Sequence, residues 1–177
     1  MGATGNVTGT HLHYEIRNKS NKYGDDQNPA TYMGIPNKVG LYESNNYQIT
    51  EMPDISYEVH VQNIGWQEQK ENGELAGTEG QSLRIEAIKI HADIPIQYRV
   101  HIQDKGWTEF VTNSCEAGTT GESKRIEAIE IISSKNPIRA TAHIEGIGNV
   151  YYEENTHLII GTEGRALRLE ALRLQFI

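Results

Sequence analysis

The stretch GTEGQSLRIEAIKI occupies residues 77–90, and modified copies of it occupy residues 118–131 and 161–174. The three copies begin 41 and 43 residues apart. Each is a Gly-Thr-x-Gly turn followed by Arg, an apolar residue, Glu, Ala and another apolar residue. Self-similarity at a fixed period of roughly 20–50 residues is the signature of a repeat architecture. We therefore expect this part of the chain to consist of three copies of one structural unit.

A second recurring segment lies upstream of each copy. Residues 60–66 and 101–107 share the pattern His-apolar-Gln, two variable residues, Gly and Trp. Residues 143–149 keep the His and the Gly but end in Asn149 instead of Trp. The three units then span residues 55–94, 95–135 and 136–177.

The residue pattern inside each unit is typical of short β-strands. Tyr57, Val59 and Val61 alternate with polar residues, which is the period of a half-buried strand. Glycines and an Asn-Gly pair mark turns between these segments, and no segment has the period of a helix. One such unit cannot bury its own apolar face, so three must pack together. We predict an all-β body with pseudo-threefold symmetry, best described as a closed β-prism, with a β-trefoil as the alternative.

The composition excludes several classes of function. The net charge is −8 and the sequence pI is about 5.4, which argues against partners such as nucleic acid or an anionic membrane. The sequence has no apolar run long enough to span a bilayer and no signal peptide. Its single cysteine, Cys115, excludes an internal disulfide and a zinc site built from cysteines.

Two histidines near the N-terminus suggest a different kind of chemistry. On a strand, His11 and His13 would point to the same face, where both could reach a metal ion. The flanking residues 5–17, together with Asn-Pro-Ala-Thr-Tyr-Met at residues 28–33, resemble the C-terminal end of M23-type zinc peptidoglycan endopeptidases. This resemblance implies that His13 is a zinc ligand and that His11 acts in catalysis.

The resemblance covers only part of a peptidase domain. The family's other zinc ligands, a His and an Asp, come from a segment well upstream, whereas only ten residues precede His11 and none of them is His or Asp. We therefore expect residues 1–35 to be a C-terminal remnant of that domain, followed by a linker over residues 36–54. The chain by itself would have no cofactor and no enzymatic activity, and Zn²⁺ would belong to the complete parent enzyme.

The repeats resemble a second family. The apolar-His-apolar segment, the Gly-Trp pair, the Gly-Thr-x-Gly turn and the Arg-Ile-Glu-Ala-Ile strand look like ChW repeats, the clostridial hydrophobic repeats with a characteristic tryptophan. The resemblance implies an extracellular module that binds a polymer of the cell surface.

Together the two resemblances predict the cell-wall-binding module of a phage endolysin or bacterial autolysin. It would direct an M23 zinc endopeptidase to the wall of a Gram-positive, clostridium-like cell and act at that wall. One alternative is an oligomerisation subunit that binds another copy of the chain or the full-length lysin. Another is a piece of the active zinc endopeptidase itself.

Aromatic residues are the first candidates for ligand binding. Trp66 and Trp107 follow a turn in an otherwise polar segment, and their rings could stack on a sugar. The alternative is that both rings pack between the sheets at the threefold axis. In the third unit, Tyr151 and Tyr152 could supply the ring that Asn149 lacks.

Three Arg/Glu pairs are the second set of candidates. Each Arg lies two residues before its Glu, so both side chains occupy one strand face and could bind sugar hydroxyls or an anionic polymer. The pairs are Arg84/Glu86, Arg125/Glu127 and Arg168/Glu170. The alternative is that each forms a same-face ion pair or binds the turns of the neighbouring unit. For the equivalent histidines His60, His101 and His143 we expect structural hydrogen bonds.

Overall fold

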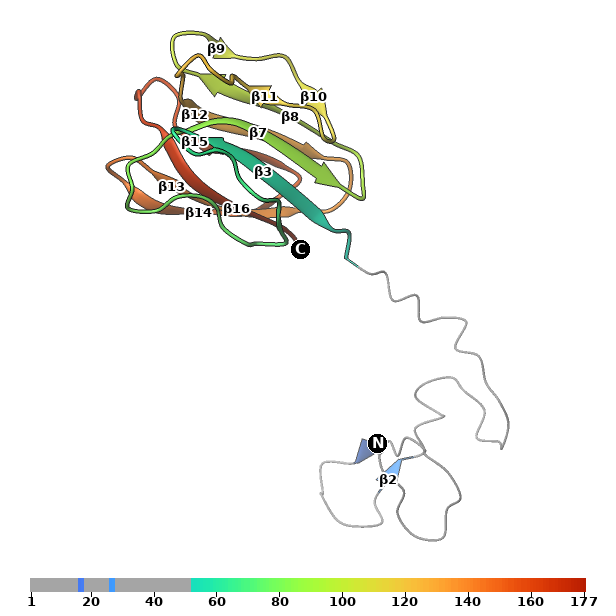
Figure 1. The fold of residues 1–177 in the computed structure, drawn as a ribbon. Coiled ribbons are helices and arrows are strands. Elements are labelled where there is room, and N and C mark those ends of the chain that lie inside the picture. Colours follow the sequence, from blue (N-terminus) through green and yellow to red (C-terminus); the bar gives the residue numbers. More distant parts are fainter. Residues whose placement is uncertain (1–15, 18–25, 28–51) are drawn as a thin grey trace. The chain divides into compact units, whose positions relative to one another are not determined.

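The computed structural model describes residues 16–17, 26–27 and 52–177 (Figure 1). By their contacts, residues 50–177 form a unit separate from residues 1–49. In the N-terminal unit, β1 (Ile16–Arg17) pairs antiparallel with β2 (Asp26–Gln27). His11, His13 and most of the predicted linker lie outside the described residues. The peptidase remnant therefore stays a prediction.

Each repeat unit consists of short strands joined by tight turns. The first contains β3 (Ile55–Val61), β4 (Gly65–Trp66), β5 (Lys70–Glu71), β6 (Ala76–Gly77) and β7 (Ile85–Ala92). The second contains β8 (Ile96–Ile102), β9 (Gly106–Trp107), β10 (Val111–Thr112), β11 (Ala117–Gly118) and β12 (Ile126–Ser133). The third contains β13 (Ile138–Ile144), β14 (Gly148–Asn155), β15 (His157–Gly161) and β16 (Leu169–Phe176).

The described residues contain no helix, which confirms the all-β prediction for this part of the chain. Consistent with this, no helix that could cross a membrane is found among them.

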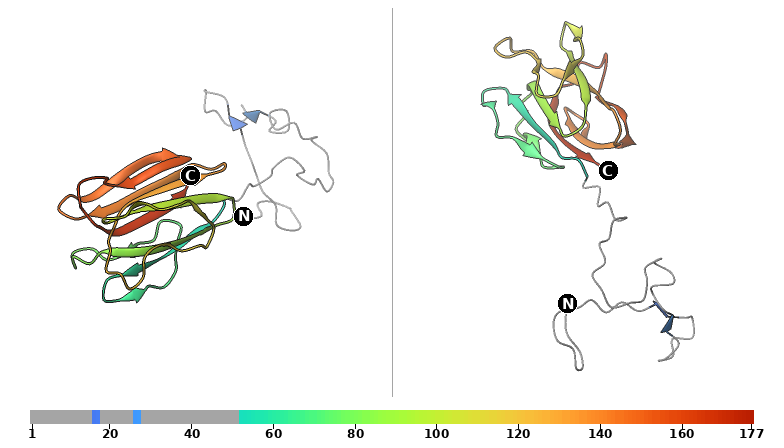
Figure 2. Two further views of the ribbon diagram at one scale, coloured as in Figure 1. Left: turned by 90° about the horizontal axis from the view of Figure 1, so that it is seen from above. Right: turned by 90° about the vertical axis from the view of Figure 1, so that its right-hand side faces the viewer.

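The strands form three sheets that exchange strands in a cycle. The first sheet has the order β11-β7-β3-β4, with β5 also on β3; the second has β10-β8-β12-β15, with β9 on β8; the third has β14-β13-β16-β6. Each sheet thus takes one strand from another unit: the second unit gives β11 to the first sheet, the third gives β15 to the second, and the first gives β6 to the third. The sheets do not join into one barrel. The first and third sheets lie on opposite sides of the body (Figure 2).

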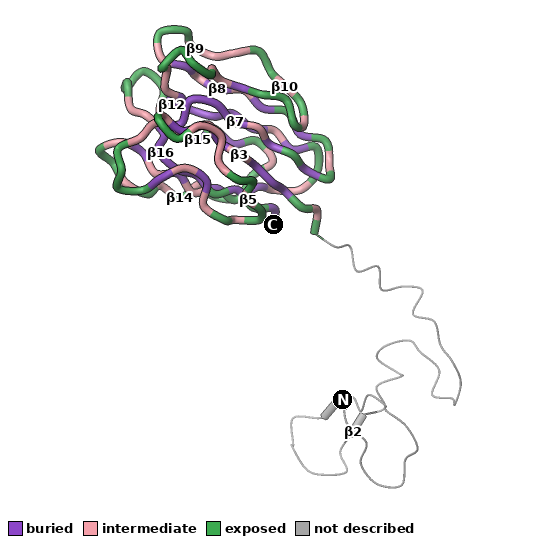
Figure 3. The backbone as a smooth tube through the Cα atoms, viewed as in Figure 1, coloured by how far each residue is buried: buried purple, intermediate pink, exposed green. Residues whose placement is uncertain are grey.

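The core follows the alternating pattern of the sequence. In β3 the apolar residues Tyr57, Val59 and Val61 are buried, whereas Glu58 and His60 are only half-buried on the outer face. The equivalent strands β8 and β13 show the same alternation. Burial is concentrated along the long strands, and the turns are exposed (Figure 3). The three inner faces together form a single apolar cluster rich in isoleucine.

A β-bulge recurs at the Glu of each repeated motif. In the first sheet His60 pairs with Ala87 and Val61 pairs with Ile85, which leaves Glu86 without a partner in the ladder. The second and third sheets skip Glu127 and Glu170 in the same way. A bulge frees backbone groups from the ladder and redirects side chains.

The freed carbonyl groups connect the units. Each accepts a hydrogen bond from the backbone N–H of the Thr in another unit's Gly-Thr turn. The pairs are Thr119 to Glu86 at 2.9 Å, Thr162 to Glu127 at 2.8 Å and Thr78 to Glu170 at 2.8 Å. These bonds follow the same cycle as the exchanged strands, so they connect every unit to the other two.

The glycine that precedes each Thr makes this close approach possible. A Cβ atom on Gly118 would lie 2.4 Å from the carbonyl oxygen of Glu86, and the corresponding distances for Gly77 and Gly161 are 2.3 Å to Glu170 and Glu127. Gly118 also has φ +121°, a conformation that side chains disfavour. The first Gly of the repeated motif is therefore required by contact between units as well as by the turn.

Two buried tyrosines add further connections between units. The hydroxyl of Tyr57 accepts a hydrogen bond from the N–H of Leu174 at 3.0 Å and donates one to the carbonyl of Glu74. The hydroxyl of Tyr98 likewise accepts from Ile90 at 2.9 Å and donates to the carbonyl of Cys115, an exposed residue in the turn before β11. Burial of the hydroxyl is the main reason that the pKa of each tyrosine rises from 10.0 to about 12.

We expect Gly118→Ala to destabilise the protein by at least about 3 kcal/mol, because the added carbon would overlap the backbone of β7 in an unfavourable backbone conformation. Gly121→Ala is the matched control, since Gly121 also has a positive φ but has open space where its Cβ would lie. It should cost only about 1 kcal/mol. Urea unfolding would measure both changes, and equal losses would show that the contact between units contributes nothing.

The tyrosines predict a loss of stability in alkali. Because the folded state raises their pKa values above the unfolded value of 10.0, their contribution is complete below pH 10 and is lost as the pH rises towards 12. Tyr98→Phe should remove roughly half of this alkaline loss. Unfolding curves at increasing pH, with the ultraviolet absorbance of tyrosinate as a second signal, would test it. A pH-independent stability of the unaltered protein would contradict the expectation.

Candidate functional site

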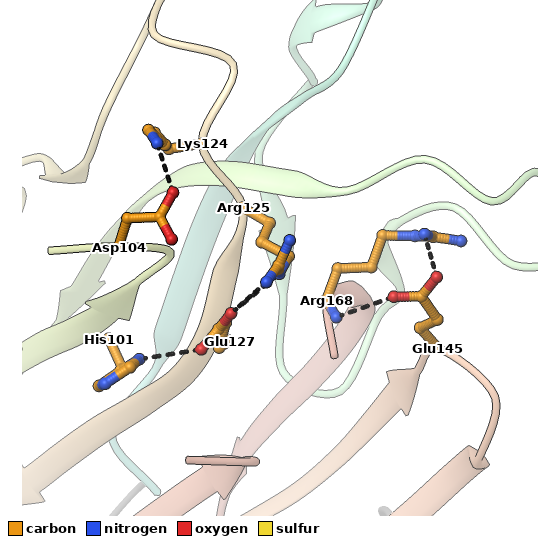
Figure 4. Close-up of polar contacts among 7 residues, drawn as sticks. All are labelled: His101, Asp104, Lys124, Arg125, Glu127, Glu145 and Arg168. Carbon is orange, nitrogen blue, oxygen red and sulfur yellow. Dashed lines mark hydrogen bonds and ion pairs between the residues drawn. The ribbon is translucent and has the colours of Figure 1, made fainter. Parts of the chain in front are cut away.

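A cluster of polar and aromatic side chains covers the outer face of each sheet, centred on the Glu of the bulge. In the second sheet Glu127 is only 5% exposed. Nε of Arg125 donates a hydrogen bond of 2.9 Å to Oε1 of Glu127, and Nη2 of Arg125 lies 2.7 Å from the same oxygen (Figure 4). In the first sheet Arg84 binds Glu86 in the same way, at 2.8 and 2.7 Å. In both sheets the guanidinium thus holds one oxygen of the carboxylate and leaves the other free for a further contact.

The remaining carboxylate oxygen faces a histidine. Nδ1 of His101 lies 3.2 Å from Oε2 of Glu127, and Nδ1 of His60 lies 3.1 Å from Oε2 of Glu86. Neither Nδ1 atom makes a hydrogen bond, so each imidazole ring only packs against its carboxylate. The expected structural hydrogen bonds are therefore wrong for these two histidines, although each still lies against its Glu.

Each of these histidines carries a tryptophan on its other side. His60 pairs with Trp66 across β3 and β4, and their rings meet edge to face with centroids 5.6 Å apart. His101 and Trp107 have the same arrangement at 5.4 Å. Both tryptophans are partly exposed and lie outside the apolar core. The alternative that they pack between the sheets at the threefold axis is wrong, because each ring lies on the polar outer face, beside the histidine of β3 or β8.

A cation lies over each tryptophan ring. Nζ of Lys89 is 4.0 Å from the ring centroid of Trp66, and the guanidinium carbon of Arg99 is 4.9 Å from that of Trp107. Arg99 also lies 4.6 Å from the ring of Phe110. Such cation–π contacts orient the ring and the charge together. Lys89, Arg99 and Phe110 are part of the cluster but were not predicted from the sequence.

The two cations lie on different strands of the equivalent central strand pairs: Lys89 is on the closing strand of its unit, and Arg99 is on the first strand of its unit. Lys89 on β7 faces Glu58 on β3, with 3.0 Å between Nζ and Oε1. In the second sheet the signs are exchanged: Arg99 on β8 faces Glu130 on β12, with 2.7 Å between Nε and Oε2. In both sheets the cation next to the tryptophan is thus neutralised by a glutamate on the facing strand.

The third unit has the equivalent Arg, Glu and His but lacks the tryptophan. Arg168 binds Glu170 at 2.8 Å through Nε, and Nε2 of His143 lies 3.6 Å from Glu170. Nδ1 of His143 instead makes a hydrogen bond of 2.9 Å with Oδ1 of Asn149. Here the expected structural hydrogen bond of the histidine is confirmed, with the amide of Asn149 as its partner.

Ion pairs connect the turn after the first strand of a unit to the start of its closing strand. Lys124 binds Asp104 at 2.7 Å, and this hydrogen bond holds the pKa of Asp104 below its usual value (Figure 4). In the third unit Glu145 accepts hydrogen bonds from the backbone N–H and the guanidinium of Arg168 (Figure 4). These contacts brace the turns next to the outer clusters.

The two tyrosines predicted to replace the missing ring point in opposite directions. Tyr151 pairs with Thr141 on the outer face and is 79% exposed. Tyr152 pairs with Ala140, packs against the core, and accepts a hydrogen bond of 2.8 Å from the N–H of Gly161. Tyr151 is therefore available to a ligand, whereas Tyr152 has a structural role.

The Arg/Glu pairs have two interpretations, ligand binding and a same-face ion pair. The same-face ion pair is present in all three units. The Glu side chains are buried and each accepts a hydrogen bond from its Arg, and the neighbouring turn contacts the backbone carbonyls of the Glu residues. The arginines are partly exposed, so a ligand could contact the Arg of each pair but not the buried Glu. Among the described residues no group of His, Cys, Asp and Glu is arranged to hold a metal ion.

Comparison with known proteins supports part of the predicted family. The family model "Clostridial hydrophobic W" (ChW) matches residues 60–92 and 101–132. We refer to these two matched segments as the ChW repeats. No curated protein and no solved structure matches the chain. ChW repeats occur in cell-surface and cell-wall-associated proteins of clostridia.

The ChW matches cover less than the sequence predicted. Residues 136–177 lie outside both matched segments, although their strands and their contacts among His143, Arg168 and Glu170 follow those of the two ChW repeats. The missing tryptophan is one difference that separates this unit from the ChW pattern. The peptidase resemblance of residues 1–35 has no counterpart among the matches.

Glu130 gives the outer face of the second ChW repeat an acid-sensitive contact. Burial would raise its pKa, but hydrogen bonds from Arg99 and from His157, at 2.7 Å each, outweigh that effect and hold the pKa below the ordinary 4.5. Because the folded pKa is depressed, the stabilisation is present above about pH 4.5 and is lost as the pH falls through the folded value.

We therefore expect Glu130→Gln to lower stability by about 1–3 kcal/mol at neutral pH and by much less in acid. Denaturant unfolding at the two pH values would measure the difference. Glu109→Gln, at an exposed position, is the control and should change little at either pH. A Glu130→Gln penalty that does not depend on pH would rule out the charge as its origin.

Proposed function

We propose that residues 55–177 bind a polymer of the bacterial cell wall, peptidoglycan or an associated glycopolymer. The observation that carries the proposal is the position of Trp66 and Trp107. Both are partly exposed on equivalent outer faces, and neither belongs to the apolar core. Each ring is held at a fixed angle by a histidine and a cation. A rigid aromatic surface beside charged and amide groups suits the apolar face and the hydroxyl groups of a sugar.

The arrangement of the units favours a repeating ligand. Three outer faces with equivalent Arg, Glu and His residues would contact a polymer at several points. Weak affinity at each face would then give a high overall affinity for the polymer. The occurrence of ChW repeats in wall-associated clostridial proteins agrees with such a ligand. The cyclic exchange of β6, β11 and β15 supports a β-prism, which presents three separate outer faces, over a β-trefoil.

We further propose that this module directs a zinc peptidoglycan endopeptidase of a phage endolysin or autolysin to the wall. The support is the resemblance of residues 1–35 to the M23 family, in which His11 and His13 would serve the complete parent enzyme together with its Zn²⁺. In this proposal the chain itself contributes attachment and the parent enzyme contributes hydrolysis.

Co-sedimentation with purified cell walls tests the binding role. We expect the intact chain to sediment with the walls, and the double variant Trp66→Ala/Trp107→Ala to lose roughly tenfold or more in affinity, because two aromatic contacts are removed. Ile147→Ala is the control: it removes a partly exposed apolar side chain from a turn that carries no tryptophan, and it should bind normally.

Thermal unfolding of the double variant must show that it is still folded. Walls stripped of secondary polymers would then separate peptidoglycan from an associated glycopolymer as the ligand. Failure of the intact chain to bind any wall preparation would overturn the proposal and favour a role in protein assembly.

A further inference from the structure

The central strand pairs of the three sheets differ at one equivalent position on the outer face. In the first two sheets the facing residues are Glu58 with Lys89 and Arg99 with Glu130, both within ion-pair distance. In the third sheet Arg173 on β16 faces Thr141 on β13. Among the described residues, no carboxylate lies within 4.0 Å of the Arg173 guanidinium. At this position the first two sheets each have an acidic partner for the cation, whereas the third sheet has a threonine opposite its arginine.

Within the part of the chain that the structure describes, Arg173 is held in place by an uncharged group. Its Nη1 donates a hydrogen bond of 3.1 Å to the carbonyl of Gly73, in the turn that precedes the exchanged strand β6. The carbonyl is uncharged, so this bond fixes the guanidinium and leaves its positive charge and its other N–H groups for an external partner. Guanidinium groups bind carboxylate and phosphate oxygens through two parallel hydrogen bonds.

A second arginine borders the same shallow hollow. Arg139 lies diagonally across the strand pair from Arg173, because Arg139 pairs with Gln175 and Thr141 pairs with Arg173. The hollow is lined by Arg139, Thr141, Arg173 and Gln175. Arg139 makes an ion pair with Glu154 at an exposed position, which a competing anion can replace at little cost.

An exposed aromatic ring completes the row. Tyr151 on β14 pairs with Thr141 from the side opposite Arg173, so Tyr151, Thr141 and Arg173 follow one another across the outer face of the third sheet. Tyr151 is the most exposed of the large apolar side chains in the described part of the chain. An aromatic ring and an arginine on either side of a small hydroxyl side chain suit a sugar that carries an acidic group.

We propose that the outer face of the third sheet binds an oxyanion, a phosphodiester or a carboxylate, of a wall glycopolymer through Arg173. Arg139 adds a second cation at the edge of the hollow, and Tyr151 stacks on the adjoining sugar. This inference rests on the proposed wall binding and specifies its ligand chemistry. It also gives the third unit, which lacks the tryptophan, a ligand of its own.

The substitution Thr141→Glu tests the site by restoring the pairing of the first sheet. A glutamate at residue 141 would face Arg173 as Glu58 faces Lys89, and would neutralise the cation without removing it. Thr141→Gln is the matched control for size and shape. Arg173→Gln removes the charge directly, and thermal unfolding would check that all three variants are folded.

The probes are soluble polymers added to the intact chain: poly(glycerol phosphate), polygalacturonate and a neutral glucan. We expect the intact chain and Thr141→Gln to bind at least one anionic polymer, and Thr141→Glu and Arg173→Gln to bind it roughly three- to tenfold more weakly. Neutral glucan should not distinguish the variants. Preference for the phosphate polymer or for the carboxylate polymer identifies the source of the oxyanion.

Two results would overturn the site: no binding of either anionic polymer by the intact chain, or binding by folded Thr141→Glu and Arg173→Gln that is as strong as that of the intact chain. Its failure is separable from failure of the wall-binding proposal. If walls bind the chain and Thr141→Glu equally well, the oxyanion site is wrong and wall attachment stands. If the anionic polymer binds through Arg173 but walls do not, the site stands and wall attachment is wrong.

Discussion

The contact between a glycine of one unit and the bulged glutamate of another is the constraint on which the structure depends. Gly118 lies against the backbone of Glu86 so closely that no side chain fits between them, and the following N–H, of Thr119, takes the carbonyl that the bulge has freed. The same contact in the other two units closes the cycle of exchanged strands. An isolated unit would leave these carbonyls and its apolar face unsatisfied, so the three units stabilise one another.

The bulge also determines the outer surface. It leaves the Glu side chain facing the same side as the preceding Arg and the His of the adjacent strand, where the Arg neutralises it and the His packs beside it. The His in turn sets the angle of the Trp in the two ChW repeats. A feature required for contact between units therefore also supports the aromatic surface to which we assign ligand binding.

The units differ mainly at positions that are not needed for the backbone contacts between units. The Gly, the bulged Glu and its Arg are the same in all three, whereas the facing residues on the outer strands vary in charge: Glu58 with Lys89, Arg99 with Glu130, and Thr141 with Arg173. Side chains on an outer sheet face can change without disturbing the core. The three units thus share one backbone arrangement but present outer faces with different chemistry.

The sequence by itself determined the number of units, their all-β character, the inward residues of the long strands and the Arg/Glu pairs, because each follows from spacing along one chain segment. It also indicated Tyr151 and Tyr152 together, but only the pairing with β13 separated the exposed ring from the buried one. The tertiary structure alone decided which sheet receives β6, β11 and β15, placed the tryptophans on the outer faces, and left Arg173 without an acidic partner among the described residues. These features depend on the register between strands that are distant in sequence, and in the third sheet on residues as far apart as Gly73 and Arg173. A local pattern specifies which face a residue takes on its own strand, but not which residue of another strand will lie beside it.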